Sequence, residues 1–288
     1  MNIFDLSWNS HHLEIGKRTL IMGIVNVTPD SFSDGGIFFN CDDAVAHGEK
    51  MVEDGADIID IGGESTRPFS DSVSAQEEIR RVIPVIKELA KRVSVPISID
   101  TTKATVAKRA LEAGASMIND IGALRLDPDM ASVVSEHGVP VILMHMLGTP
   151  KTMQNFPEYD DLIKEVKSFL ADAINRAEKS EIPKTKIIID PGIGFGKTVE
   201  HNLILLKNLH EFLSLGVPVL IGSSRKAFIR KIIKDETAQD ISPDLPVVET
   251  GTQASIAAAI FNGAHIVRVH DVANTRATVK IADAIKHV

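Results

Sequence analysis

Eight short, β-branched apolar runs alternate with stretches of helical periodicity along this 288-residue chain, and this alternation restricts its fold more than any other feature. Continuous apolar runs of this kind are typical of strands buried on both faces, as in a parallel sheet. The runs are TLIMGIVNV, ADIIDIG, VPISID, SMINDIG, VPVILMH, KIIID, VPVLIGS and HIVRVHD. Successive β-then-α units predict an α/β chain folded as a single-domain (β/α)8 TIM barrel. A doubly wound open sheet is the alternative, because it produces the same alternation.

The stretches between the runs carry signals for helix ends. The stretch DDAVAHGEKMVEDG is expected to end at Gly55, and a glycine also precedes the strands in EAGASMINDIG and FNGAHIVRVHD, so we predict a glycine cap at each of these helix ends. Ser74, followed three residues later by Glu77, predicts a capping box. Pro84 lies in the same helical stretch and is expected to kink or divide it.

The chain divides unequally into an extension and a barrel. Residues 1–18 precede the first barrel strand, and we predict that they form a short hairpin-like extension capping the barrel bottom. Residues 19–288 are predicted to form the barrel, with the last helix near Val272 to His287. The polar segment 235–248, DETAQDISPDLPVV, is interpreted as an insertion within the seventh helical segment.

Composition excludes several classes of protein. Asp and Glu outnumber Lys and Arg by 39 to 31, and the formal charge of −8 argues against general nucleic-acid binding, which needs clustered positive charge. The lone Cys41 cannot form an intramolecular disulfide, so a disulfide-stapled secreted domain is excluded. No apolar run approaches the roughly 18 residues of a membrane-spanning helix, and MNIFDLSWNSHH does not resemble a signal peptide. We therefore expect a cytoplasmic protein that binds neither nucleic acid nor membranes.

Polar side chains recur where the predicted strands end. In a barrel these positions lie at the C-terminal face, where the active sites of such folds are built. Any one of them is explained as a satisfied strand-end group, but the recurrence over many strands favours a site. The residues are Asn26, Asp60, Asp100, Asn119, Asp120, His145, Asp190, Ser223, Ser224, Arg268 and His270.

The glycine-rich segment DPGIGFGKT only partly matches two phosphate-binding motifs. A Walker A sequence requires glycine where Pro191 stands, and a dinucleotide-binding GxGxxG requires glycine where Lys197 stands. The segment still allows the backbone to approach a flat ligand closely. The ten histidines include no HExxH pair, and Cys41 offers no cysteine partner, which disfavours a tight zinc site.

Other chemistries use the same strand-end residues. Lys226 is a candidate imine-forming lysine, although its polar SSRK context fits an anion or carbonyl donor better. Strand-end aspartates also suit a planar heterocycle with amidine-like N–H groups, because a carboxylate accepts two parallel hydrogen bonds. An enolase-type magnesium site is the further alternative, with the ligand set Asp60, Glu64, Asp100 and Asp190.

Several blocks together resemble the dihydropteroate synthase family, in the family's order and over nearly the whole chain. The blocks are MGIVNVTPDSFSDGG, IGGESTRP, ISIDT, INDI, IIIDPGIGFGKT with EHNL, SSRK and RVHDV. The resemblance implies a (β/α)8 barrel that joins 6-hydroxymethyl-7,8-dihydropterin pyrophosphate to 4-aminobenzoate. The products are 7,8-dihydropteroate and pyrophosphate, in folate biosynthesis. It also implies Mg²⁺ as cofactor, sulfonamides as inhibitors, and a homodimer formed through late helices, for which SIAAAIFNG offers an apolar face.

The resemblance also implies roles for individual residues. Arg268, His270 and Thr66 are expected to bind the pyrophosphate, and Asn26 to ligate its magnesium. Two closing loops would form the aminobenzoate pocket, one with Asp34 and the other with Ser65 and Arg67. The deep pterin pocket would be lined by Asp100, Asn119, Asp190 and Lys226, with Met144 and Phe195 as apolar contacts.

Two positions depart from the family pattern, and two alternative functions remain. Phe69 stands where the family commonly has glycine, and Ala227 follows SSRK where many members carry Ser or Arg. Both departures concern the aminobenzoate contacts rather than the pterin pocket. The alternatives are a methyltetrahydrofolate-binding methyltransferase barrel and a catalytically silent pterin-binding paralogue. TPDSFSDGG, STRP and the RVH ending argue against the methyltransferase, since methyl transfer has no pyrophosphate to hold.

Overall fold

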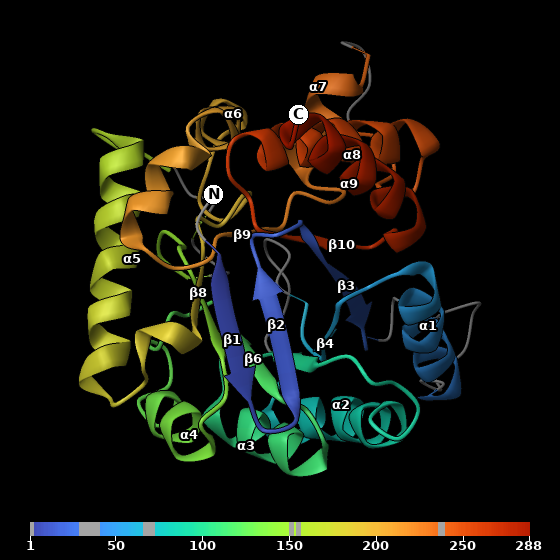
Figure 1. Cartoon of the computed structure of the whole chain (residues 1–288), viewed down its shortest axis with the longest axis vertical. Coiled ribbons are helices and arrows are strands. Elements are labelled where there is room, and N and C mark those ends of the chain that lie inside the picture. The colour runs from blue at the N-terminus through green and yellow to red at the C-terminus, as the bar shows by residue number, and fades with distance from the viewer. Residues whose placement is uncertain (1–2, 29–40, 66–72, 150–152, 154–156, 236–239) are drawn as a thin grey trace.

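Eight parallel strands form the centre of the molecule, as a computed structural model shows for residues 3–28, 41–65, 73–149, 153, 157–235 and 240–288 (Figure 1). They are hydrogen-bonded in the order β8-β7-β6-β5-β4-β3-β10-β9. A parallel bridge from Ile189 to Val219, which directly precedes β9, brings the two edges of the sheet together. The predicted TIM barrel is confirmed, and the open doubly wound sheet is excluded. The strands are β3 (Leu20–Asn26), β4 (Ile58–Gly62), β5 (Ile97–Asp100), β6 (Met117–Asp120), β7 (Val141–Met144), β8 (Ile187–Asp190), β9 (Leu220–Ile221) and β10 (Ile266–Val269).

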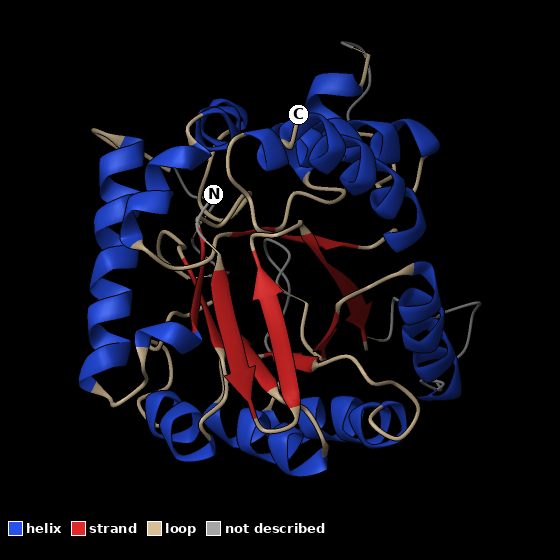
Figure 2. Ribbon diagram, in the orientation of Figure 1, coloured by secondary structure: helices blue, strands red, loops and turns tan. Residues whose placement is uncertain are grey.

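Helices surround the strands, as Figure 2 shows in blue around red. Between β9 and β10 the chain forms two helices, so the predicted seventh helical segment is split, and the predicted insertion 235–248 runs into the start of the second. The helices are α1 (Cys41–Asp54), α2 (Ala75–Leu89), α3 (Ala104–Ala113), α4 (Met130–His137), α5 (Leu162–Lys179), α6 (Val199–Lys207), α7 (Ala227–Ile233), α8 (Pro246–Phe261) and α9 (Val272–Lys286), with short 3-10 helices η1 (Lys184–Lys186) and η2 (Leu209–Leu215).

The helix ends test the local predictions. Gly55, Gly114 and Gly263 have φ values of +107°, +119° and +107°, so the three predicted glycine caps adopt the left-handed conformation that glycine tolerates best. Each one directs the chain from a helix into the next strand. These caps therefore set where β4, β6 and β10 begin.

Helix α2 differs from its prediction at two points. The Ser74 side chain accepts a hydrogen bond from the Glu77 backbone N–H, but the Glu77 carboxylate pairs with Arg80 and Arg81, both at 2.8 Å. Only one half of the predicted capping box is therefore confirmed, because the two guanidinium groups bind the carboxylate that would complete it. The helix also continues through Pro84, so the predicted division at that residue is wrong.

The N-terminal residues form an antiparallel hairpin of β1 (Phe4–Trp8) and β2 (His11–Ile15). Its Leu6, Trp8 and Ile15 side chains are buried. The Phe4 ring meets the edge of His265, with 5.3 Å between ring centroids, directly before the start of β10. The hairpin thus packs at the N-terminal end of the barrel strands, opposite the polar strand ends. Among the helices of the described residues, none is long and apolar enough to cross a membrane.

Candidate active site

The C-terminal ends of four adjacent strands bring predicted site residues to one level of the barrel. Asn26, Gly62, Asp100 and Asn119 are successive register partners across β3, β4, β5 and β6. Alternate residues of a strand point to the same face, so Asp60 lies on the face of β4 to which Gly62 belongs, one step deeper. The predicted convergence of strand-end polar groups is confirmed for these residues.

Arg268 connects this level across the barrel. Its Nε lies 2.6 Å from Asp60 Oδ2, and its Nη2 lies 2.7 Å from Asp100 Oδ2. Asn119 Nδ2 donates to the same Asp60 oxygen at 2.9 Å. His270 Nδ1, in contrast, lies 2.9 Å from Ser224 Oγ. The two residues expected at the pyrophosphate therefore contact different parts of the barrel: Arg268 reaches β4 and β5, while His270 contacts the loop after β9.

Two strand-end carboxyl groups are held out of water. Burial raises the pKa of Asp100 to about 7, although the Arg268 charge opposes this change. Burial also raises the pKa of Asp190, against the backbone N–H of Gly192 that donates to its Oδ1 at 2.7 Å. A ligand that donates N–H groups to these carboxylates would favour their charged form, because hydrogen bonds to a carboxylate stabilise it.

Lys226 is a half-buried cation beside these acids. Its pKa is lowered to about 8, first by desolvation and then by the Arg268 charge, while Asp190 and Asp100 oppose the shift. Its Nζ lies 4.0 Å from the centroid of the Phe195 ring, within the range of a cation–π contact. The predicted pterin-pocket residues Lys226 and Phe195 are thus in direct contact.

A small apolar wall lies beside these charges. It forms a buried cluster distinct from the main core and includes both predicted apolar contacts, Met144 and Phe195. Met144 ends β7 as the register partner of Asp190, so apolar and acceptor groups are adjacent. This combination suits a flat heterocycle that has apolar faces and a polar edge. The other members of the cluster are Ile121, Met146 and Met153.

The glycine-rich loop between β8 and α6 contains a buried cation that the sequence analysis did not assign to the site. Lys197 Nζ lies 2.9 Å from His145 Nδ1 and donates to the Phe195 carbonyl oxygen at 2.9 Å. Burial lowers the pKa of Lys197 to about 7. The pKa of His145 is lowered to about 2, mainly by burial and to a smaller extent by the Lys197 charge. Lys197 thus anchors the loop that carries Phe195. Its signal in the sequence was a lysine within a glycine-rich segment that follows a buried strand.

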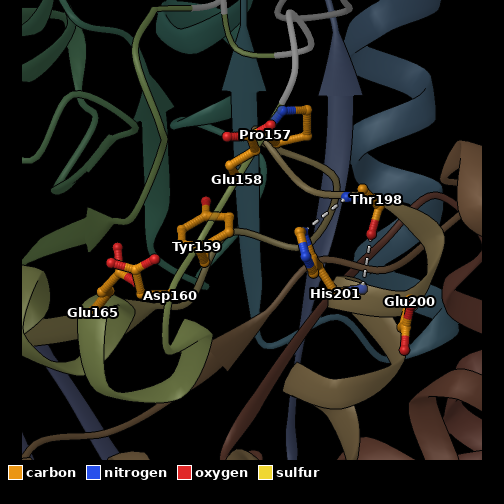
Figure 3. A pocket seen from close by; sticks show the side chains of 8 residues that line it. All are labelled: Pro157, Glu158, Tyr159, Asp160, Glu165, Thr198, Glu200 and His201. Carbon is orange, nitrogen blue, oxygen red and sulfur yellow. Dashed lines mark hydrogen bonds between the residues drawn. The ribbon is translucent and has the colours of Figure 1, made fainter.

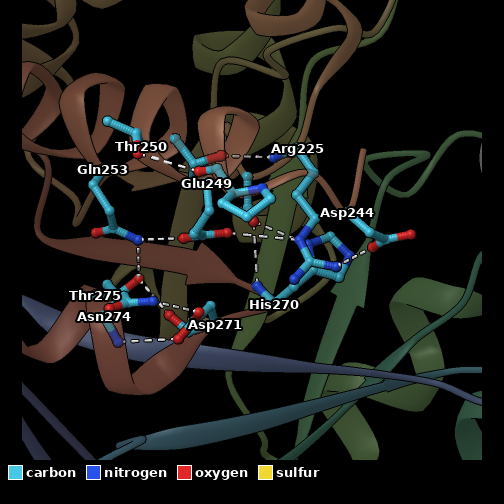
Figure 4. A network of polar contacts seen from close by, with 12 residues as sticks. Arg225, Asp244, Glu249, Thr250, Gln253, His270, Asp271, Asn274 and Thr275 are labelled. Carbon is cyan, nitrogen blue, oxygen red and sulfur yellow. Dashed lines mark hydrogen bonds and ion pairs between the residues drawn. The ribbon is translucent and has the colours of Figure 1, made fainter. Parts of the chain in front are cut away.

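A polar network fixes the loop that carries Lys226 (Figure 4). Arg225 adopts a left-handed φ of +57°, and its backbone N–H donates to Thr252 Oγ1 at 3.0 Å. Its side chain pairs with Asp244 at 2.6 Å and with Glu249 at 3.6 Å. Arg225 therefore joins the end of β9 to α8 and to the segment before it, and Lys226 follows it into the site.

A hollow of about 540 Å³ lies outside the barrel end, between the segment before α5 and the start of α6 (Figure 3). Tyr159 borders it, stacks edge-on with His201 at 5.2 Å, and donates to the Gly196 carbonyl at 2.8 Å. Four of its lining residues are acidic, so its charge does not favour a phosphorylated ligand. The lining residues are Pro157, Glu158, Tyr159, Asp160, Glu165, Thr198, Glu200 and His201.

The enolase-type magnesium set is not assembled. Arg268 engages two of its carboxylates, and Lys103 Nζ lies 2.6 Å from Glu64. In the part of the chain that the structure describes, no cluster of three or more His, Cys, Asp or Glu side chains could hold a metal ion.

The structure describes some of the residues predicted for the loops and the metal site, but not all of them. Asn26 is half-buried at the end of β3, Ser65 is half-buried after β4, and Ala227 begins α7. The remaining loop predictions lie outside the described residues: Asp34, Thr66, Arg67 and Phe69.

Known sequences match this chain over most of its length. A family model described as "Pterin binding enzyme" matches residues 22–270. The chain is 48% identical to a dihydropteroate synthase of Synechocystis sp., over 94% of this chain and 91% of that one. It is 47% identical to the dihydropteroate synthase of Bacillus subtilis, over 95% of this chain and 90% of that one.

Solved structures match equally broadly. Xanthomonas albilineans dihydropteroate synthase with 4-aminobenzoic acid superposes with a TM-score of 0.91, at 44% identity and full coverage of both chains. The Yersinia pestis enzyme in a sulfonamide drug complex gives 0.89, at 42% identity and 99% coverage of each chain. The X. albilineans enzyme in complex with 7,8-dihydropteroate gives 0.87, at 42% identity and 99% coverage of each chain.

Proposed function

This chain belongs to the pterin binding enzyme family, and from that premise we propose that it acts as a dihydropteroate synthase. It is a transferase of folate biosynthesis. It joins 6-hydroxymethyl-7,8-dihydropterin pyrophosphate to 4-aminobenzoate. The C–O bond of the pterin methylene breaks, a C–N bond to the amine forms, and pyrophosphate and a proton leave. The site is also a target for sulfonamides, as the drug complex of the Y. pestis relative indicates.

The observation that carries this function is the row of acceptors at the strand ends. Asp100, Asn119 and Asp190 offer oxygen atoms beside the apolar wall of Met144 and Phe195. A pterin presents the complementary features, because its aminopyrimidine edge carries N–H donors and its ring faces are apolar. Carboxylates accept such paired N–H groups side by side.

We assign the pyrophosphate to Arg268, His270 and Thr66, and its magnesium to Asn26. The described acidic and imidazole groups do not form a metal cluster of their own, which fits an ion held mainly by substrate phosphates with few protein ligands. The Asn26 amide supplies a neutral oxygen at the same level as Asp100. When bound, magnesium would offset the negative charge that grows on departing pyrophosphate. The aminobenzoate is assigned to the loops with Asp34, Ser65 and Arg67.

Two alternatives explain less. A methyltetrahydrofolate-binding methyltransferase would use a pterin pocket but has no use for pyrophosphate ligands. A silent pterin-binding paralogue would not need Arg268 and His270, the residues assigned to the pyrophosphate. The relatives named for the synthase reaction also favour the enzyme.

We further propose a cytoplasmic homodimer whose ligands are small molecules rather than nucleic acid or membranes. The net charge of −8 disfavours binding to a phosphate backbone, and the single cysteine suits a reducing compartment. Exposed apolar side chains on α7, α8 and α9, among them Ile232, Phe261 and Ile281, support an interface there.

The direct test is a reconstituted reaction. The purified protein is incubated with dihydropterin pyrophosphate, magnesium and labelled 4-aminobenzoate, and the products are separated. We expect equal amounts of dihydropteroate and pyrophosphate, and no dihydropteroate when either organic substrate is omitted. Pterin binding without any product would instead identify the silent paralogue.

A further inference from the structure

Asp60 lies beneath the pterin residues and has been assigned no part in the reaction. Its side chain is fully buried in the middle of β4. One of its oxygens, Oδ2, accepts two hydrogen bonds, from Arg268 Nε at 2.6 Å and from Asn119 Nδ2 at 2.9 Å. A single buried atom thus holds two residues of the proposed site.

The chemistry of this contact determines which way the Asn119 amide faces. A carboxylate paired with a guanidinium can only accept hydrogen bonds, so the amide group next to it must be the NH2. The carbonyl oxygen of Asn119 then faces away from Asp60. Asn119 is the register partner of Asp100, so its carbonyl oxygen lies beside the Asp100 carboxyl group at the ends of the strands.

We propose that Asp60 is a positioning residue of the pterin site, which fixes Asn119 with its amide oxygen toward the ligand. This inference rests on the proposed function and deepens it. With Asn119 locked, its oxygen lies beside the carboxyl groups of Asp100 and Asp190, so this side of the pocket selects ligand edges that carry N–H donors when both acids are ionised. A ligand that presents an acceptor there meets an unpaired buried oxygen, which is costly.

The hydrogen bonds around Asp60 make Asp60→Asn a conservative substitution. In Asp60→Asn the side-chain oxygen must stay next to Arg268, because the amide NH2 cannot accept a hydrogen bond from the Arg268 Nε–H. The same oxygen can still accept from Asn119. The new NH2 then replaces Oδ1, which has no hydrogen-bond partner among the described residues. The register partner Ser98 has a buried hydroxyl that likewise lacks one within the described chain. The amide variant therefore removes the charge but keeps the orientation, whereas Asp60→Ala removes both.

The experiment measures the dissociation constant of unphosphorylated 6-hydroxymethyl-7,8-dihydropterin by calorimetry. We expect Asp60→Asn to stay within about threefold of wild type and Asp60→Ala to weaken binding by about tenfold or more, as loss of a buried hydrogen-bond partner does. Ser98→Ala is the matched control, since it removes a neighbouring buried polar atom and should leave the dissociation constant unchanged. Melting temperatures establish that each variant is folded. If Asp60→Ala does not fold, Asp60→Leu fills a similar volume without an acceptor and replaces it.

A double-mutant cycle with Asn119→Ala separates positioning from a general structural role. If Asp60 acts through Asn119, removing Asp60 should weaken pterin binding by less than about threefold once Asn119 is absent, against about tenfold in its presence. An equal loss in both backgrounds, or a loss for Asp60→Asn as large as for Asp60→Ala, would overturn the inference. Failure of the wild-type protein to bind the pterin would instead reject the proposed function, so the two failures are distinguishable.

Discussion

Burial brings several charged side chains of the site toward neutrality at the same place. The pKa values of Asp100 and Asp190 are raised, and those of Lys226 and Lys197 are lowered, because a low-dielectric surrounding disfavours each charged form. Such shifts gather at functional sites, where groups must exchange partners when a ligand arrives. Here the ligand would supply N–H donors for the acids, whereas Lys197 already contacts His145 and the Phe195 carbonyl oxygen.

Asp190→Asn tests the acceptor role of a single atom. Asp190 Oδ1 already accepts from the Gly192 N–H, so the substituted amide will keep its oxygen there and turn its NH2 toward the ligand. Donor then faces donor, and we expect pterin affinity to fall by about tenfold or more. Calorimetry measures the affinity, and thermal melting should show a folded variant. Near-normal affinity in that folded variant would contradict the assignment, whereas a lower melting temperature with unchanged affinity would make Asp190 a structural cap.

The sequence predicted the residues that end strands better than the residues that hold them. Asp100, Asn119 and Asp190 end apolar runs, and that position alone predicts where they converge. The partners of Asp60 and Lys197 could not be predicted in this way. Their contacts join β4 to β10 and β7 to the glycine loop, and pairings between such distant segments depend on barrel closure, which no local pattern encodes.

In the glycine loop after β8, the backbone restricts which residues the sequence can carry. Gly192 has a φ of +73°, and a Cβ there would lie 1.9 Å from the His145 carbonyl oxygen. Gly216 has a similar φ of +71°, but a Cβ there would meet only the end of the Lys184 side chain, no closer than 3.5 Å. An alanine at either position would carry the cost of a left-handed backbone, but only an alanine at Gly192 would also clash with a backbone atom. Comparing the two variants therefore separates the two costs.

We expect Gly216→Ala to lower the free energy of unfolding by about 1–2 kcal/mol, the cost of a left-handed non-glycine residue. Gly192→Ala should cost more than this, because the loop must also move away from His145, and pterin binding should weaken with it. Denaturant unfolding measures both variants. Equal losses of stability would show that the contact with His145 is easily relieved.

The contact between the hairpin and the barrel has a predictable pH dependence. His265 Nδ1 accepts from the Val219 N–H at 3.1 Å, so its proton sits on Nε2, and its ring packs against that of Phe4. Burial lowers the pKa of His265 from 6.5 to about 4. The unfolded chain therefore binds the proton first as pH falls, and this residue's stabilisation is lost progressively from about pH 6.5 to about pH 4.

His265→Asn keeps an acceptor for the Val219 N–H but cannot titrate in this range. The variant's melting temperature should fall less than that of wild type as the pH is lowered from 6.5 to 4. Taking the difference between the two proteins cancels the contributions of the buried acids, whose raised pKa values act in the opposite direction. Identical pH profiles would show that His265 does not control this interface.

Element boundaries were predictable wherever a single residue type determines them. The caps at Gly55, Gly114 and Gly263 follow from the left-handed conformation, which has few other occupants. The capping box at α2 was half wrong, because Glu77 has two arginine partners that a motif of four residues does not include. Whether the Glu77 carboxylate binds the cap or the arginines depends on which side chains the helix places next to it, and the four-residue motif does not contain that information.

For the molecule as a whole, exposed apolar surface predicts its assembly. Phe261 on α8 and Ile281 on α9 are 48% and 64% exposed, and these two helices pack side by side (Figure 1). We expect a dimer in sedimentation equilibrium, and a monomer when both residues are replaced by Glu. Leu203→Glu on α6, at 46% exposure, is the matched control and should leave the dimer intact. A wild-type monomer at all concentrations would contradict the proposed interface.

The distribution of charge across the barrel end favours bond cleavage before amine attack. In the proposed reaction, Arg268 and Lys226 would attract the departing pyrophosphate, while ionised Asp100 and Asp190 would stabilise positive charge that spreads into the pterin ring. The amine of aminobenzoate is uncharged at neutral pH and needs no prior deprotonation to attack. Glu64, a carboxylate in the segment after β4, is already paired with Lys103 at 2.6 Å and is therefore poorly placed to act as a base.

Isotope exchange can show this order of events directly. Dihydropterin pyrophosphate carrying heavy oxygen at the bridge between carbon and phosphorus is incubated with the enzyme and magnesium, without aminobenzoate. Reversible cleavage lets the phosphate rotate before it recombines, so the label should move from the bridge to the non-bridging oxygens, or pyrophosphate should be released slowly as water captures the cation. The substrate without enzyme serves as the control. If neither process occurs until the amine is added, the amine takes part in breaking the bond, and a concerted displacement describes the reaction better than the charges of the site suggest.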